Sequence, residues 1–430
     1  MKRKNVLSAI LASVLLCTTV CTACGKNDSD LYIAEESEKS VISLFTQGVK
    51  VSESIEEYCY DLMNPDTGKE IVLYTDSADF YADEGLSYRE LLAKRMNSGK
   101  ADDLYLIPAE DVLEFSSKGY IYDLSNLDCV DNLSDDALIQ STYDGMVFSI
   151  PLSYTCFGFI WNVDLLHKYG LEVPDNLNEF WNVCETLKQN GVLPYGSNTD
   201  FGLGVPAMCK GLYDVYQSDD SEELLNSLSD GTTPVSTYME KGFAFIEEMI
   251  NKGYMDPEQA LNTLPLTEEE TQFFAEENCA FITALYRART FEGYSFQVEM
   301  TPLPILDDGK ICVVGADQRL AVNPNSEQLD DALAIMEIMG KTSTLDSIAN
   351  SLGKISTSKN ATAPDIPESK DIISYVAQGK QIPNQDFRLH FNVWNNVKEL
   401  ALKVCQGMSA KDAAAEYDER QAAEIAAYGK

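Results

Sequence analysis

Short apolar runs alternate with amphipathic stretches in the first third of the chain. The apolar runs predict buried strands at 40–45, 70–75 and 103–107. The amphipathic stretches predict helices at 51–63, 88–96 and 109–117. Because strands and helices alternate, the pattern favours an α/β fold with a parallel sheet and right-handed crossovers.

The stretch Gly145–Asn162, GMVFSIPLSYTCFGFIWN, organises the middle of the chain. We predict a strand over 146–150, a turn set by Pro151 and a second apolar strand that ends at Asn162. A helix follows over 163–169 and ends at a glycine, a residue that readily closes helices. The next helix begins after a proline and carries apolar residues at helical spacing: Leu177, Phe180, Trp181, Cys184 and Leu187.

The later part of the chain continues with further helices and another apolar strand. Gly191–Gly211 contains glycines and aromatic residues and is interpreted as a loop. A strand is predicted within 277–286, and helices are predicted over 238–253 and 329–339 and near the C-terminus.

The first thirty residues have the features of a secretory signal. Lys2–Lys4 precede an apolar run over 6–20, which is shorter than a membrane span requires. Small residues then precede Cys24, as in bacterial lipoprotein cleavage sites. We expect residues 1–23 to be a signal peptide, Cys24 to carry a lipid anchor, and the polar, acidic residues 24–39 to form a flexible tether. The alternative is a plain cleaved signal peptide, with Cys24 an ordinary residue.

Charge and length narrow the possible classes of protein. The formal net charge of −37 becomes −40 once the three basic residues of the signal are removed. This charge argues against binding to nucleic acid or to an anionic membrane face. The roughly 390 residues after the tether exceed one ordinary hydrophobic core, so two lobes are expected.

Eight cysteines follow Cys24, and none of them has CxxC spacing. A zinc site is therefore not expected, and we predict no metal and no cofactor. Cys156, Cys184 and Cys312 lie in apolar strands or on an apolar helix face, where cysteine behaves as a small hydrophobic residue. We expect mostly buried free thiols; disulfides, which export would permit, are the alternative.

The order of these segments resembles the family 1 extracellular solute-binding proteins, the lipid-tethered or periplasmic receptors of ABC importers. The similarity is carried by Asn162-Val-Asp-Leu-Leu, Gly119-Tyr-Ile-Tyr-Asp-Leu, Met300-Thr-Pro-Leu-Pro and Gly407-Met-Ser-Ala-Lys-Asp-Ala-Ala. It covers most of residues 40–425, and the ordered set is more specific than any one motif.

The resemblance implies a two-lobed periplasmic-binding-protein-like fold of type II, with a ligand cleft between the lobes. The implied hinge crossovers lie near 150–155 and 300–304. The N-terminal lobe would comprise 40–152 plus 305–370. The C-terminal lobe and closing helices would comprise 153–304 plus 371–430.

Candidate ligand-binding residues follow from strand ends and from the resemblance. Ligands of parallel sheets bind beyond the carboxyl ends of strands, where Gln47 and Asp76 fall. A sugar needs aromatic faces and a few polar side chains around its hydroxyls. The resemblance implies stacking aromatics at Tyr286 and Trp394 and a cleft side chain at Tyr154. Phe201, in the aromatic loop, and Asp317 complete the predicted set.

Each of these residues also has a structural interpretation. The polar ones could satisfy backbone amides in their own loops, and Trp394 could pack in a helix core. Arg287 and Arg289 are conspicuous in so acidic a chain. In a cleft they would favour a carboxylated ligand, but surface ion pairing is the expectation.

Several sequence motifs typical of enzymes are incomplete or missing. Gly202–Ala207 matches GxGxxA, but no clear strand precedes it and Pro206 interrupts it. The chain has no P-loop, and its two histidines are too few for a zinc cluster.

We therefore expect a monomeric, non-enzymatic receptor that is lipid-anchored on the extracellular face of the bacterial cytoplasmic membrane. It would deliver a small carbohydrate or oligosaccharide to an ABC permease by hinge closure. A secreted polysaccharide-active enzyme is one alternative. A binding lipoprotein for a non-sugar solute, or one that reports to a sensor, is another.

Overall fold

The computed structural model describes residues 39–362 and 364–428, and the chain from Lys39 onward forms one compact unit. The predicted signal peptide, Cys24 and nearly all of the predicted tether lie outside the described residues. No helix in the described part has the length and apolar character needed to cross a bilayer.

The first part of the unit is the predicted parallel sheet with intervening helices. Strands β1 (Lys39–Thr46), β3 (Glu70–Ser77) and β4 (Leu104–Ile107) pair in parallel, with β1 in the centre. Helices α2 (Val49–Cys59), α3 (Tyr88–Asn97) and α4 (Val112–Ser117) follow these strands in turn.

The first predicted helix is shorter than expected. Asp61 has a φ of 54°, and the next two residues form β2 (Leu62–Met63), which pairs antiparallel with β3. Residues 60–63, predicted as helix, therefore turn the chain back toward the sheet.

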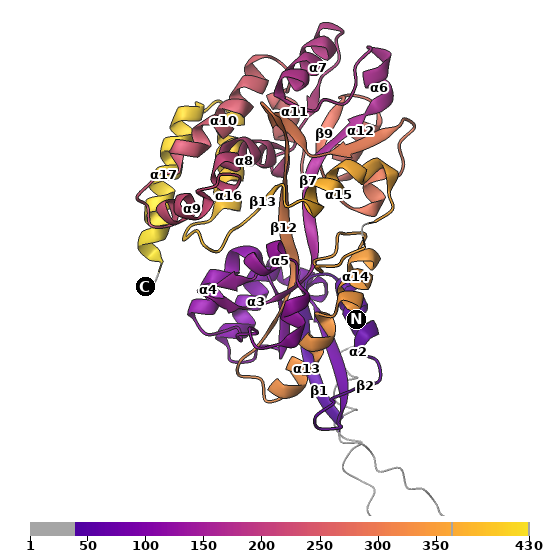
Figure 1. Ribbon diagram of the computed structural model, residues 1–430, viewed down its shortest axis with the longest axis vertical. Helices are drawn as coiled ribbons and strands as arrows, with labels where there is room; N and C mark the ends of the chain where they lie inside the picture. The colour runs from indigo at the N-terminus through magenta and orange to yellow at the C-terminus, as the bar shows by residue number, and fades with distance from the viewer. Residues whose placement is uncertain (1–38, 363, 429–430) are drawn as a thin grey trace, which may run out of the picture. The chain divides into compact units, whose positions relative to one another are not determined.

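Two long antiparallel strands, β7 (Ile150–Asn162) and β12 (Gly309–Val322), connect the sheet to the rest of the molecule (Figure 1). The strand order is β2-β3-β1-β4-β12-β7-β9-β8, where β9 is Phe281–Leu285 and β8 is Tyr195–Gly196. The turn predicted at Pro151 is wrong, because Pro151 lies within β7 opposite Arg319. The ladder is irregular there, since Gln318 has a φ of 52°, and strand prolines are typically found at such irregularities.

Shorter strands surround the far half of β7 and β12. Strands β9 (Phe281–Leu285) and β10 (Val298–Thr301) pair with β7, whereas β11 (Leu303–Leu306) and β13 (Gln381–Pro383) pair with β12. A two-residue strand β8 (Tyr195–Gly196) extends β9. The segment 300–304, predicted as the second crossover, thus belongs to β10 and β11. The second strand that connects the first sheet to the rest of the molecule, beside β7, is β12.

Helices pack around these strands. The longer ones are α7 (Leu177–Gln189), α8 (Phe201–Tyr216), α10 (Ser236–Asn251), α13 (Leu329–Met339), α14 (Thr342–Ser351), α16 (Val393–Cys405) and α17 (Ala410–Ala427). The shorter ones are α5 (Asp135–Ile139), α6 (Val163–Lys168), α9 (Ser221–Ser229), α11 (Pro257–Asn262), α12 (Glu268–Ala275) and α15 (Lys370–Ala377). A small hairpin, β5 (Thr142–Tyr143) and β6 (Met146–Val147), precedes β7.

The loop predicted over Gly191–Gly211 is half helix, because α8 begins at Phe201. Its glycines allow close helix packing. A Cβ atom at Gly211 would collide with the sulfur of Met239, and one at Gly242 of α10 would collide with the carbonyl oxygen of Ala207. Close contact with α10 therefore accounts for Gly211, which resembles a loop glycine in the sequence.

Two hydrophobic clusters form the core, and β7 contributes to both. Ile150, Leu152 and Cys156 belong to the cluster that contains the first sheet, whereas Phe157 and Phe159 belong to the cluster around α8, α10 and α16. All eight cysteines of the described residues are buried and free, as expected. Burial raises the pKa of the Cys59 and Cys129 thiols to about 12.

Candidate functional site

The carboxyl ends of the parallel strands meet β7 and β12 along one line of the sheet. Thr46 ends β1, and Ile107 ends β4 directly opposite Arg319 of β12. Asp317 of β12 in turn lies opposite Ser153 of β7. Ligands bind at such strand ends in α/β sheets, so this line is where a site is expected.

One face of β7 and β12 carries a polar cluster on this line. Thr155 Oγ1 donates a hydrogen bond of 2.9 Å to Asp317 Oδ2, and the Lys354 ammonium forms an ion pair with the same oxygen. Burial opposes ionisation of Asp317, but Lys354 and these hydrogen bonds hold the pKa of its carboxyl below its usual value. The result is an ionised, partly accessible acceptor for hydroxyl groups.

Aromatic rings continue the same face. Phe157 follows Thr155 by two residues, so both side chains point the same way from β7. The Phe157 ring lies 5.4 Å from Phe201 and 5.3 Å from Trp394, centroid to centroid. Phe157 and Phe201 are buried, and Trp394 is half-buried at the edge.

A second ion pair borders these rings. Lys398 lies 5.0 Å above the Trp394 ring and forms a 2.9 Å ion pair with Asp200, the residue before α8. We call the set of Thr155, Asp317, Phe157, Phe201 and Trp394 the polar–aromatic face. It combines a carboxylate and a hydroxyl group with apolar rings, which is what a polyhydroxylated ligand requires.

A sequence model of a family described as "Bacterial extracellular solute-binding protein" matches residues 87–377. The chain belongs to this family. A solved family 1 extracellular solute-binding protein from Bifidobacterium longum subsp. infantis is 19% identical, with a TM-score of 0.73 over 90% of this chain and 100% of that one. The fold is therefore the expected two-lobed α/β fold of periplasmic binding proteins.

Other similar proteins have named ligands. RafE of Streptococcus pneumoniae, solved in complex with raffinose, is 15% identical, with a TM-score of 0.67 over 90% of this chain and 100% of RafE. The multiple sugar-binding protein of Streptococcus mutans is 22% identical over 190 residues, 43% of this chain. That match spans 42% of the length of the Streptococcus mutans protein.

Three of the seven predicted ligand-binding residues of this solute-binding protein meet on the polar–aromatic face: Phe201, Asp317 and Trp394. Tyr154 and Tyr286 lie on the opposite side. Tyr154 precedes Thr155 on β7, and Tyr286 follows Leu285, which pairs with Phe157. Both tyrosine rings belong to the hydrophobic cluster of the first sheet. This placement favours a packing role for them.

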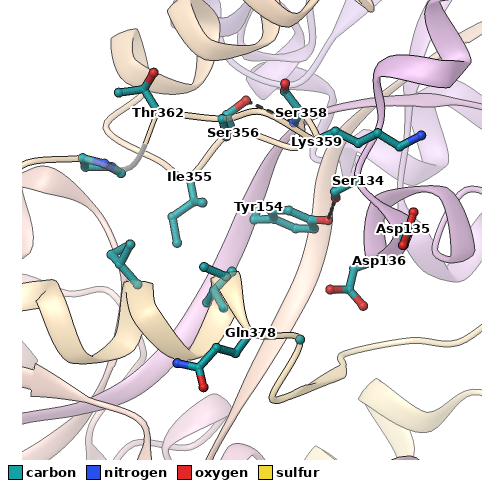
Figure 2. A pocket seen from close by; sticks show the side chains of 16 residues that line it. Ser134, Asp135, Asp136, Tyr154, Ile355, Ser356, Ser358, Lys359, Thr362 and Gln378 are labelled. Atoms are coloured by element: carbon teal, nitrogen blue, oxygen red, sulfur yellow. Dashed lines mark hydrogen bonds between the residues drawn. The ribbon is translucent and has the colours of Figure 1, made fainter.

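Tyr154 instead borders a separate cavity of about 610 Å³ between α5, residues 355–362 and α15 (Figure 2). Its hydroxyl group forms a 2.6 Å hydrogen bond with Ser134, and only 4% of the residue is exposed. A ligand in that cavity would find little aromatic surface, so we place the candidate site on the polar–aromatic face.

The remaining two predicted residues lie at the ends of β1 and β3. Gln47 is exposed just beyond β1. Asp76 is already engaged, because its Oδ2 accepts hydrogen bonds from Arg95 at 2.5 Å and from the Tyr81 hydroxyl at 2.6 Å. A ligand role for either stays a prediction.

The surface ion pairing expected for Arg287 and Arg289 is wrong. No carboxylate of the described residues forms an ion pair with either one, and both border a cavity of about 310 Å³ next to Phe201. Sequence reasoning also missed Thr155, Phe157 and Lys354. Alternation around Tyr154 could have identified the first two, but no sequence signal connects Lys354 to Asp317.

No group of three or more His, Cys, Asp or Glu side chains within the described residues could hold a metal ion.

Proposed function

We propose that this solute-binding protein is a receptor for a small carbohydrate or oligosaccharide and that it releases the sugar to an ABC permease. The polar–aromatic face carries the proposal. Asp317 and Thr155 supply partners for hydroxyl groups, and Trp394 supplies a ring for the apolar face of a sugar. The sugar-binding names of the Streptococcus mutans protein and of RafE support the same class of ligand.

Hinge closure is the proposed mechanism. The lobes are proposed to comprise 40–152 plus 305–370 and 153–304 plus 371–430, and β7 and β12 run through the region where they would bend. A ligand that contacts both lobes binds the closed state more tightly than the open state. It shifts the equilibrium toward the closed state by the difference between these two binding free energies. The closed form would then be the one that the permease recognises.

Thermal unfolding in the presence of ligands tests the receptor function. The protein is screened against neutral mono- and oligosaccharides, sugar acids and amino acids at equal concentration. A ligand at 100 times its dissociation constant stabilises the folded state by about 2.7 kcal/mol. A shift with a saccharide that remains intact on prolonged incubation supports a receptor. Stabilisation by amino acids alone would contradict a sugar ligand, and consumption of the saccharide would indicate the enzyme.

The proposed anchor is tested by replacing Cys24 with serine. Lipidation at Cys24 predicts that wild-type protein sediments with membranes and that Cys24→Ser protein is released. Intact mass spectrometry measures the added acyl mass directly. Wild-type protein cleaved before Cys24 but carrying no lipid would establish the plain signal peptide instead.

A further inference from the structure

The cavity next to Phe201 contains an unusual pair of cations. Arg287 follows β9, and Arg289 is two residues further on. Arg287 is half-buried and Arg289 is exposed. Burial and the neighbouring Arg289 both lower the pKa of Arg287, and Asp317 acts in the opposite direction. Two like charges have thus been brought together at one wall of a 310 Å³ cavity.

The other arginines of the described residues are differently placed. Arg89, Arg95, Arg388 and Arg420 each form an ion pair with a carboxylate. Arg319 lies deep in the structure, 3% exposed, and also has an interaction partner. In a chain with 69 acidic residues, a half-buried guanidinium such as that of Arg287, with no acidic partner within 4 Å, requires a specific explanation.

The acidic residues of the cavity do not neutralise this pair. Glu270 is 8% exposed, and its carboxylate accepts hydrogen bonds from Asn198 and from the backbone N–H of Leu266 at 2.7 Å. Burial raises the pKa of Glu270, which weakens its tendency to carry a charge. Glu292 is exposed and forms no ion pair with either arginine.

The arginine pair adjoins the polar–aromatic face. Phe201 borders the cavity and also contacts Phe157. Leu285, two residues before Arg287, pairs directly with Phe157. Arg287 also interacts electrostatically with Asp317. One ligand can therefore contact the face and reach the arginines.

We infer that the sugar bound by this protein carries a carboxylate, as uronic acid residues do, and that Arg287 and Arg289 bind that group. The inference rests on the proposed function. A guanidinium presents two parallel N–H groups to a carboxylate, and such charge-assisted pairs are among the stronger hydrogen bonds in proteins. The half-buried Trp394 ring stacks against the sugar, Phe201 forms part of the cavity wall, and the carboxylate supplies a counter-charge for the two arginines.

Calorimetric titration of the protein at pH 7 with matched saccharides tests the inference. The probes are galactobiose with digalacturonate, and cellobiose with cellobiouronate. We expect the acidic member of at least one pair to bind about 10- to 100-fold more tightly than the neutral member, since a hydrogen bond to a charged group contributes that much. Arg287→Gln and Arg289→Gln should each reduce this preference, and Arg287→Lys should restore part of it. Lys411→Gln, which removes an exposed positive charge from α17, is the matched control and should leave the preference unchanged.

The outcomes separate the inference from the function. If neutral saccharides bind as tightly as their acidic partners, or if Arg287→Gln weakens both equally, the carboxylate is not recognised but the receptor function stands. If no saccharide of either kind binds, the proposed function fails and the inference fails with it. If Lys411→Gln reduces the preference as much as Arg287→Gln, overall charge rather than a built site explains the effect.

Discussion

The ion pair between Asp317 and Lys354 allows the structural and functional roles of Asp317 to be separated. The Lys354 side chain is 10% exposed, whereas the Asp317 side chain is 33% exposed. Removing one partner of a fully buried pair costs about 3–5 kcal/mol, and an exposed pair contributes about 0–1 kcal/mol. The exposure of this pair lies between these two cases, so we expect Asp317→Asn to lower the free energy of unfolding by about 2 kcal/mol.

The assay is urea unfolding of the two single variants and the double variant at pH 7. Asp317→Asn leaves an unpaired ammonium in a confined site, and adding Lys354→Met removes that ammonium. The double variant should therefore be more stable than Asp317→Asn by about 1 kcal/mol or more. Equal stability of the double variant and Asp317→Asn would refute the reasoning, because the charges would then not be coupled.

Ligand titration of the same variants isolates the functional role. If Asp317 accepts hydrogen bonds from the sugar, affinity falls in Asp317→Asn and stays low in the double variant although stability recovers. Recovery of affinity together with stability would show that Asp317 acts only through the local fold. Lys354→Met alone is the control that retains the carboxylate.

The pH dependence of this pair has a defined sign. Because the pKa of Asp317 is lowered in the folded protein, its contribution to stability is complete above its unfolded pKa, about 3.9. That contribution is lost as the pH falls through the lower folded value. Stability should therefore differ between wild type and Asp317→Asn at neutral pH, and the difference should shrink only in strong acid.

Three further predictions follow from packing and burial. Gly242→Ala should lower the free energy of unfolding, measured in urea, by about 1–3 kcal/mol or more, because the new Cβ would collide with the Ala207 carbonyl. Glu240→Ala, at an exposed position of the same helix, is the control and should change stability little. Equal losses of stability in the two variants would contradict the close packing of α8 and α10. Trp394→Ala should weaken sugar binding about tenfold by calorimetry, and Trp181→Phe should not, since Trp181 packs among other core rings. The eight buried thiols should react with iodoacetamide only after unfolding, as measured by peptide mass spectrometry; rapid labelling of the native protein at any of them would be inconsistent with its burial.

Elements specified by local patterns could be predicted from the sequence. The helix predicted over 329–339 is α13, Leu329–Met339, and the first three strands lie within two residues of their predicted bounds. Each consists of a periodic apolar pattern bounded by turn residues, so its neighbours in the sequence already determine it. Burial of the free cysteines followed from the same apolar contexts.

Features that depend on distant contacts could not be predicted. Pro151 resembles a turn residue, but pairing with β12, more than 150 residues later in the sequence, keeps it in a strand. Gly211 resembles a loop glycine, but it lies where Met239 of α10 packs against α8. In both cases the residue type favours a turn or loop, but tertiary packing determines the observed structure.

The same limit applies to the site. Asp317, Phe201 and Trp394 could be identified by residue type and family resemblance, but the face on which each lies depends on strand register. Successive residues of a strand point to opposite sides, so a shift of one position exchanges Tyr154 for Thr155. In a strand buried on both faces, both sides are apolar, so the sequence pattern does not show whether Tyr154 or Thr155 faces the site.

That exchange has a mechanical consequence. Tyr154 is anchored on its side of β7 by its hydroxyl bond to Ser134 and by a 2.8 Å backbone bond to the Ile355 carbonyl. Thr155, the next residue, presents its hydroxyl to Asp317 on the other side. The group that would contact a ligand is therefore held by the strand that would bend during hinge closure. Binding energy at Asp317 would act directly on the hinge, which is the coupling that a receptor with an open and a closed state requires.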